Sequence, residues 1–383
     1  MNRFDEMTET HAIYFPVYKS IVERASISGE PSNMLHDFVV GQIGSKKGIR
    51  GYMFRKMYEL TGGDWKEIVP IIAAVEMHLA SIYCFNVAAD NKSGYDTPQK
   101  RETAFATRDI AFHLALKLIS QSGVFGDKTR QLEDSFIETD ETFYKGETLD
   151  VLANIYPTPT FSEEEIRVRY GIQPSLARET LEKFVHSSLD EKVLYRTYGI
   201  NAAMFENMGR VVGILRGLSI PETNALTSFG RNYGLAMMII NDVQDYSLDL
   251  ATETTREKSC SDVFSDLKER KITWPILYYL KNNDVCSVPF GNCDYHDYDV
   301  FRKLLSQNGV MKRTVLEAMA YSRMAVNSLH SFPDNNARKM IIDSAVSISK
   351  LSKYVTLLEQ KYAVALIPSR REVHLRVQEI ALM

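Results

Sequence analysis

The sequence predicts an all-α protein that folds as one helical bundle. Hydrophobic residues recur with helical spacing from end to end, strand-like alternating runs flanked by hairpin turns are lacking, and the connections between periodic segments are mostly short. A hydrophobic content of 45% over 383 residues is enough for a sizeable core. We therefore expect one domain over residues 1–383 rather than two.

Six segments show the clearest helical periodicity, and turns rich in Gly, Pro, Asn and Asp separate them. A seventh helix is expected after Thr160, because Ser162 followed by Glu165 forms the pattern of a capping box. The six periodic segments are 65–85, 104–119, 176–185, 202–218, 272–280 and 311–329.

Composition excludes several classes of partner. A net charge of −4 leaves no basic footprint for nucleic acid. Four cysteines without a CxxC pair are compatible with a reducing cytoplasm. Cys286, Cys293 and His296 lie in a Gly/Asn/Asp-rich loop, where we expect no metal site. Because no apolar run approaches about 20 residues and the N-terminus has no apolar signal region, we expect a cytoplasmic protein that is not integral to a membrane.

An apolar segment, 233–240, leads into a ladder of oxygen-bearing side chains. On a helix these side chains would share one face within about 100° of arc. Buried carboxylates need a compensating cation, and oxygen ligands at this spacing suit Mg²⁺ beside a substrate's phosphates. The alternative is a solvated helix end whose acids face water. The ladder consists of Asn241, Asp242, Asp245 and Asp249.

Basic residues elsewhere suggest diphosphate binding. Lys47 and Arg50 lie three apart between glycines, and at a helix start such a pair would face a phosphate; the alternative is two surface cations. His78 lies in an apolar segment, either as a paired core residue or as a ligand. Further cations that could neutralise a diphosphate are Lys100, Arg101, Lys258 and Lys271.

The order of these pieces resembles the trans-isoprenyl diphosphate synthases, also called the polyprenyl synthetase family, over about residues 35–360. The family's GGKRxRP, ExxHxaSLxxDDxxD, GQxxDL, KT, GxxFQxxDDxxD and DxxxxKxTxP motifs follow one another in the same order here. They correspond to Ser45–Gly51, Glu76–Asn86, Gly146–Val151, Arg196-Thr197, Gly234–Asp245 and Asp266–Pro275.

The resemblance implies a deep central cavity, a homodimer and the chemistry of the family. Magnesium ions hold an allylic prenyl diphosphate, the diphosphate leaves, and isopentenyl diphosphate attacks the carbocation. It implies catalytic roles for Asp242, Asp245, Arg196 and Lys271. It implies substrate contacts at Lys47, Arg50, His78, Arg101, Lys258 and Asp150. It also implies Mg²⁺ ligands at Asn241, Asp242, Asp245, Asp249, Asn86 and Asp90.

The first acidic motif of the family is degenerate. Its first two aspartates fall on Phe85 and Asn86 and its third on Ala89, so Asn86, Asp90 or Asp96 would have to replace them. The residues four and five positions earlier, which set the floor of the product cavity in the family, are Ser81 and Ala80. Both are small, which predicts room for a chain of C15 or more.

The second acidic motif is altered less. Its leading aspartate is Asn241, and the family's cavity-facing Gln is Met238. Three functions remain open. The first is a prenyltransferase, with isopentenyl diphosphate or an unusual acceptor. The second is a class I terpene cyclase whose metal triad would be Asn241, Asp245 and Asp249. The third is a non-catalytic subunit of a heteromeric synthase. Substrate chain length, acceptor and product are not encoded in any motif.

Overall fold

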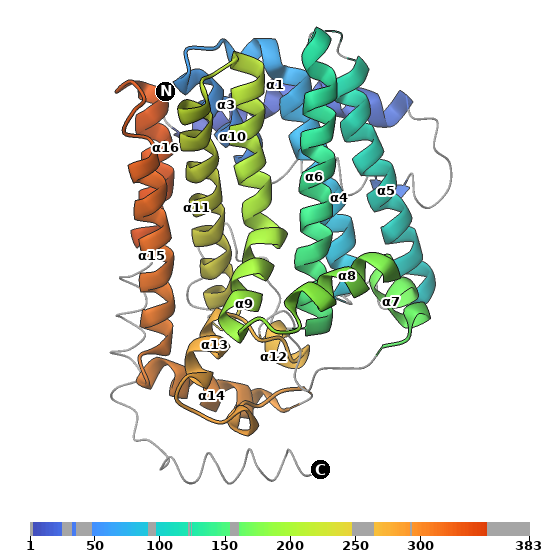
Figure 1. Ribbon diagram of the computed structural model, residues 1–383, viewed down its shortest axis with the longest axis vertical. Coiled ribbons are helices and arrows are strands. Elements are labelled where there is room, and N and C mark those ends of the chain that lie inside the picture. The colour runs from blue at the N-terminus through green and yellow to red at the C-terminus, as the bar shows by residue number, and fades with distance from the viewer. Residues whose placement is uncertain are drawn as a thin grey trace.

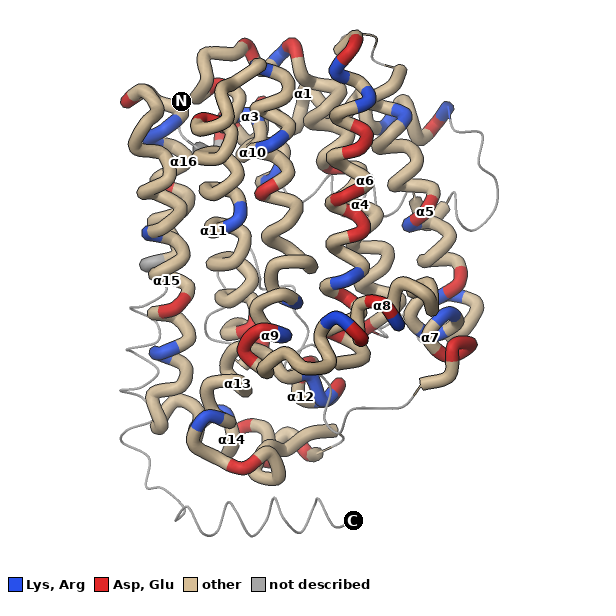
Figure 2. Tube along the Cα trace, viewed as in Figure 1, with Lys and Arg blue, Asp and Glu red and all other residues tan. Residues whose placement is uncertain are grey.

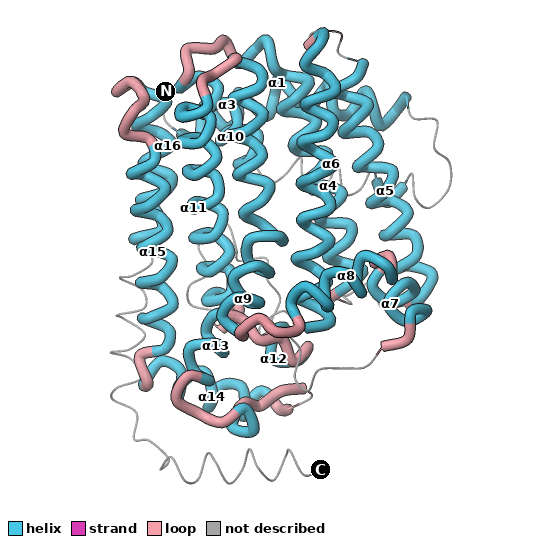
Figure 3. The backbone as a smooth tube through the Cα atoms, in the orientation of Figure 1, coloured by secondary structure: helices cyan, strands magenta, loops and turns pink. Residues whose placement is uncertain are grey.

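The computed structural model describes residues 3–24, 33–35, 48–90, 97–121, 123, 125–153, 161–246, 264–291 and 293–350. Every regular element in these ranges is helical, which confirms the predicted all-α class (Figures 1 and 3). The α-helices are α1 (Arg3–Arg24), α3 (Ile49–Leu60), α4 (Val69–Ala89), α5 (Pro98–Gln121), α6 (Thr129–Thr148), α7 (Glu163–Tyr170), α8 (Pro174–Phe184), α9 (Leu189–Thr197), α10 (Ala203–Arg216), α11 (Ile220–Gln244), α12 (Ser265–Lys268), α13 (Trp274–Leu280), α14 (Tyr295–Gln307), α15 (Val310–Ser328) and α16 (Asn336–Val346).

The long helices pack side by side. Contacts run from α15 to α11, α10, α6, α5 and α4 in succession, and α1 crosses one end of this array (Figure 1). The short helices α7, α8, α9, α12, α13 and α14 lie at the opposite end. Gly230 of α11 allows close packing on α10, because a Cβ there would lie 2.0 Å from the carbonyl oxygen of Phe205. The deep central cavity and the single-domain boundary remain predictions.

The predicted helices are present, with small shifts at their ends. Segments 104–119, 202–218 and 311–329 lie in α5, α10 and α15, and segment 65–85 forms a short 3₁₀ turn followed by α4. Ser162 caps α7 through the predicted capping box with Glu165. Here the residue types near the helix start were sufficient to place it.

The acidic ladder is not one continuous helical face. α11 ends at Gln244, so Asp245 is its C-cap residue, and Asp249 lies outside the described residues. Asp242 is 1% exposed whereas Asn241 is exposed. At this end of α11 the Asp245 carboxylate accepts hydrogen bonds from the start of α12.

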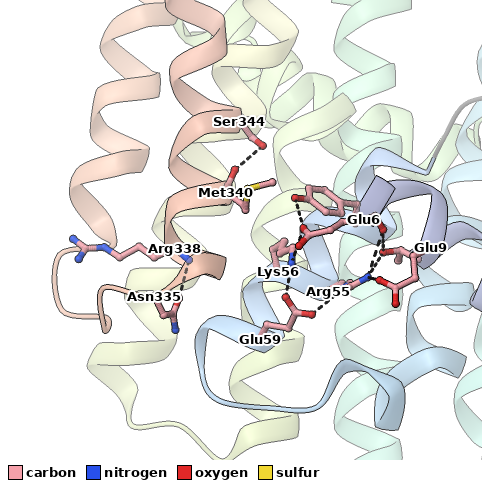
Figure 4. A network of polar contacts seen from close by, with 11 residues as sticks. Glu6, Glu9, Arg55, Lys56, Glu59, Asn335, Arg338, Met340 and Ser344 are labelled. Carbon is pink, nitrogen blue, oxygen red and sulfur yellow. Dashed lines mark hydrogen bonds and ion pairs between the residues drawn. The ribbon is translucent and has the colours of Figure 1, made fainter. Parts of the chain in front are cut away.

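Buried ion pairs attach α1 to α3 (Figure 4). Lys56 Nζ lies 2.9 Å from Glu6 and 2.6 Å from Glu59, and Arg55 contacts Glu9 at 2.7 Å. Lys56 is 2% exposed, so its charge depends on its carboxylate partners rather than on water. This network fixes α1 across the end of the bundle that lies away from α12–α14.

One helical stretch, Trp65–Ala89, is long and apolar enough to cross a membrane by length and composition alone, contrary to the sequence expectation. Its most apolar window has a mean hydropathy of 1.8, but 83% of that window is buried inside the protein. Packing against α1, α3 and α5 accounts for this apolarity. For the same reason, the segment 69–83 offers no free apolar face to a second copy of the chain.

Candidate active site

Polar side chains from distant parts of the sequence meet where several helices end. Asp90 caps the end of α4, and Asp150 lies in a π-helical turn that follows α6. Arg196 and Asp242 come from the last turns of α9 and α11. Lys271 lies between α12 and α13. Figure 2 shows acidic and basic residues gathered along α9 and α12 at this end.

Arg196 joins two of the predicted residues. Its Nη1 lies 3.1 Å from Oδ2 of Asp242, and its Nε donates to Asp150. Asp242 also accepts the backbone N–H of Trp274 at 3.2 Å, which fixes the carboxylate at the start of α13. Burial alone would lower the pKa of Arg196, but Asp242 and Asp150 outweigh it and hold the pKa well above its usual value.

Lys271 joins the other side of the site. Its Nζ lies 2.9 Å from Asp90, 2.7 Å from Asp150 and 2.7 Å from Glu269. Burial of Asp150 favours its neutral form, yet Lys271 and Arg196 outweigh burial and lower the pKa of Asp150 to about 2. Asp150 is therefore the ionised centre of a chain of alternating charges running from Asp90 to Asp242.

Carboxyl groups outnumber cations here. Within the described residues, Arg196 and Lys271 are the two basic side chains that ion-pair with this group of acids. We call the acids, which interact electrostatically with one another and with these cations, the carboxylate cluster: Asp90, Glu147, Asp150, Asp242, Asp245, Asp266 and Glu269.

Several members of the carboxylate cluster resist ionisation. Burial, followed by the charge of Asp150, raises the pKa of Glu147 well above its usual range. Burial also raises the pKa of Asp242 despite Arg196, and burial with Asp245 raises that of Asp266. The pKa of Glu269 is raised by burial to about 7. Such shifts mean that burial favours the neutral form of these acids, so the site has more carboxyl groups than its surroundings keep ionised.

Asp245 and Asn241 differ from the predicted ligand arrangement. The side chain of Asp245 accepts hydrogen bonds from the Ser265 hydroxyl at 2.8 Å and from the N–H of Asp266 at 3.2 Å, so it caps α12. Asn241 is exposed, one residue before the buried Asp242. The structure therefore brings Asp242 and Asp245 to the same cluster but holds their carboxylates with different partners.

The α4 side of the site has one aromatic and two polar positions. Phe85 is fully buried, with the rings of Phe105, Phe143 and Tyr144 at 5.4–5.6 Å between centroids. Asn86 is partly exposed, but its Oδ1 is buried and has no hydrogen-bond partner among the described residues. Phe85 therefore belongs to an aromatic core, and Asn86 and Asp90 carry the oxygens on this side.

Two predicted substrate contacts, Arg50 and His78, bind side chains outside the carboxylate cluster. Arg50, in the first turn of α3, donates to Asn201 at 3.1 Å and stacks on Phe205. His78 is buried in α4, where its Nε2 lies 3.2 Å from Asp140. Arg101 lies in the first turn of α5. Lys47, Lys258, Asp249 and Asp96 fall outside the described residues.

His78 has the surroundings of a paired core residue. Asp140 also accepts from Arg108, and burial of Asp140 is outweighed by His78 and Arg108, which lower its pKa. The rings of Phe112 and Phe136 enclose the imidazole at 5.1 and 5.7 Å. A contact between His78 and a diphosphate therefore remains a prediction, because the histidine already has a buried partner.

Sequence reasoning did not select Glu147, Asp266 and Glu269 as site residues. Glu147 and Asp266 belong to the quoted motifs, so their place beside Asp150 and Lys271 could have signalled them. Glu269 carried no motif signal. Only the turn between α12 and α13, which folds Glu269 back onto Lys271, brings it into the cluster.

The donor chemistry of the site suits Mg²⁺, because carboxylate and amide oxygens are its preferred protein ligands. The unpartnered Oδ1 of Asn86 and the excess of carboxyl groups agree with this. Among the residues that the structure describes, however, no three acidic, histidine or cysteine side chains form a ready metal site. Their oxygens contact Arg196, Lys271 and Ser265 instead.

Comparison with known proteins gives a consistent family. The sequence model named polyprenyl synthetase matches residues 100–287. A prenyl transferase of Cyanophora paradoxa is 26% identical over 244 residues, covering 62% of this chain and 67% of that protein. A probable hexaprenyl pyrophosphate synthase, mitochondrial, of Neurospora crassa is 26% identical over 163 residues, covering 42% of this chain and 35% of that protein.

The fold agrees with solved structures. A polyprenyl synthase from Caulobacter crescentus CB15, complexed with calcium and isoprenyl diphosphate, superposes with a TM-score of 0.70 at 17% identity. The match covers 91% of this chain and 97% of that one, which supports the fold. Motif order, the match over residues 100–287 and the fold thus agree, and together they support the polyprenyl synthetase family, that of the trans-isoprenyl diphosphate synthases.

Proposed function

We propose that the protein is a Mg²⁺-dependent prenyltransferase. It ionises an allylic prenyl diphosphate and transfers the prenyl group to isopentenyl diphosphate or an unusual acceptor. The observation that carries this proposal is the carboxylate cluster, in which seven acids meet two basic side chains among the residues that the structure describes. A site with such an excess of carboxyl groups is suited to take up divalent cations together with their anionic ligand.

Each side of the site has a part in this proposal. Asp242 and Asp245, with Asn86 on the opposite side, would hold Mg²⁺, which when bound neutralises the diphosphate and favours its departure. Arg196 and Lys271 are buried donors that would bind the diphosphate oxygens. Because both are held by fixed carboxylates, they would need little reorganisation as charge develops on the leaving group.

The second substrate would lie nearer to α3. The Nε of Arg50 is buried and has no hydrogen-bond partner among the described residues, whereas its Nη2 donates to Asn201. A buried unpaired donor costs about 1–3 kcal/mol, so an anion bound at the start of α3 would relieve it. This supports a second diphosphate on the α3 side, which a terpene cyclase would not need.

The two other functions are less well supported. A terpene cyclase has no second diphosphate to bind, so it would leave the buried Nε of Arg50 without a role. A non-catalytic subunit would have no need of a buried Arg196 paired with both Asp150 and Asp242, an arrangement that is costly to bury. We propose the same assembly and location as the sequence suggested, a cytoplasmic homodimer of single-domain subunits.

Product analysis tests the proposal. The full-length protein would be incubated with Mg²⁺ and allylic diphosphates of C5 to C20, with and without isopentenyl diphosphate. Products that appear only with both substrates and only with Mg²⁺ support a transferase. Cyclic hydrocarbons formed without isopentenyl diphosphate would instead show a cyclase, and no turnover under any condition would favour the subunit.

A matched pair of variants ties the activity to the site. Asp242→Asn should abolish Mg²⁺-dependent turnover, because it removes a charge at the centre of the cluster. Glu138→Gln serves as control, since Glu138 of α6 forms an exposed ion pair with Arg210 of α10. Equal loss in both variants would show that the cluster does not carry the activity.

A further inference from the structure

A single ammonium group joins the two sides of the site. Lys271 reaches Asp90 at the end of α4 and Asp150 after α6, with its third contact on Glu269. Its side chain is 7% exposed, and its backbone N–H donates to Asp266 at 2.7 Å. Backbone and side chain are thus both held, so the position of the ammonium is well defined.

The three acids around Lys271 are not equivalent. Asp150 is also held by Arg196, and Glu269 belongs to the same short segment as Lys271. Asp90 alone of the three comes from the end of α4, on the other side of the site, and its side chain is 24% exposed, against 4% for Asp150 and 28% for Glu269. An ammonium has three hydrogens to donate, so a diphosphate oxygen that binds Lys271 must replace one of these acids.

We propose that Asp90 is the counter-ion that positions Lys271 before substrate binds, and that it is not a ligand of the divalent ion. The inference rests on the proposed function, and it reassigns a residue whose sequence position suggested metal binding. When the substrate binds, its diphosphate takes the place of the Asp90 carboxylate on the ammonium. Asp90 therefore lowers the affinity for the diphosphate, because its carboxylate and the diphosphate compete for the same ammonium.

Charge supports this assignment. The Asp90 carboxylate already faces a cation, because the Lys271 ammonium lies 2.9 Å from it. Phe85, where a further ligand would be needed, is buried among aromatic rings and offers no oxygen. The Lys271 ammonium therefore occupies the position at which the end of α4 could otherwise bind a metal ion.

Two binding measurements on Asp90→Asn test the assignment. First, the affinity for inorganic diphosphate is measured by calorimetry in EDTA. It should rise about fivefold, because removing a competing charged hydrogen bond frees Lys271. Second, Mn²⁺ binding without diphosphate is measured by electron paramagnetic resonance, and its dissociation constant should stay within about twofold of the wild type.

Asp134→Asn is the control, since Asp134 is an exposed acid of α6 that pairs loosely with Arg130. It should change neither measurement. If Asp90→Asn does not fold, Asp90→Ser takes its place with the same expectations. Weaker Mn²⁺ binding would show that Asp90 is a metal ligand and overturn the assignment, and so would unchanged diphosphate affinity.

The same measurements separate this inference from the proposed function. Asp242→Asn should weaken Mn²⁺ binding at least tenfold if the cluster is a metal platform. If Mn²⁺ binding is unaffected by Asp242→Asn, the proposed function fails, whatever the result at Asp90. If only the Asp90 variant departs from expectation, the function stands and the assignment of Asp90 is wrong.

Discussion

Arg196 Nη1 lies 3.1 Å from Oδ2 of Asp242, and the two side chains are 4% and 1% exposed. The pair links α9 to the end of α11, two helices whose ends form the site. Charges buried this deeply lose their hydration, so each one is stable only while its partner is present.

Arg196→Ala should therefore destabilise the protein strongly. It leaves Asp150 and Asp242 without their shared partner, and breaking a buried pair costs about 3–5 kcal/mol. Urea unfolding of the full-length protein measures this loss. Arg210→Ala, which removes an exposed pair with Glu138, should cost less than about 1 kcal/mol. Similar losses of stability in both variants would show that the buried ion pairs of Arg196 contribute no more than an exposed pair.

Phe85→Asp should not restore the missing acidic motif. The new carboxylate would replace a fully buried ring among Phe105, Phe143 and Tyr144, at a cost of at least about 3 kcal/mol. Phe85→Leu should cost less, because it keeps the site apolar. Thermal and urea unfolding compare the two. A Phe85→Asp variant that is stable and binds Mn²⁺ more tightly would show that this position still faces the metal site.

Stability should depend on pH through Glu269. Its pKa in the folded protein is raised by burial from 4.5 to about 7, so between these values the folded protein keeps a proton that the unfolded chain has lost. This contribution to the free energy of unfolding is fully present below about pH 4.5 and is lost as pH rises to about 7. Urea unfolding of wild type and Glu269→Gln between about pH 5 and 8 should show the steeper fall in the wild type. Parallel curves would show that Glu269 does not titrate in this range.

Ala80→Phe should shift the protein towards shorter allylic substrates or products while Mg²⁺ dependence persists. Ala80 and Ser81 are both fully buried, and a close-packed site cannot accept an aromatic ring without moving. Overpacking should also cost about 1–3 kcal/mol. Chain-length analysis of the products checks the shift. An unchanged profile in a folded variant would assign both residues to helix packing alone.

The sequence by itself determined the class of fold and most of the helices. Hydrophobic periodicity and capping residues such as Ser162 act over a few neighbouring residues, so they can be recognised without knowledge of the rest of the chain. Motif order also placed Asp150, Arg196, Asp242 and Lys271 in one site, and the structure brings these four side chains together.

Only the tertiary structure decided how those groups share their charges. Periodicity placed Asn241, Asp242 and Asp245 on one helical face, but Asp245 is the C-cap of α11, and its carboxylate caps a helix that begins some 20 residues later. Glu269 enters the cluster through a turn, and Asp90 meets Lys271 across 181 residues of sequence. Local spacing gives the direction of a side chain from its own helix, whereas its partner, its burial and its pKa depend on which other helix ends there.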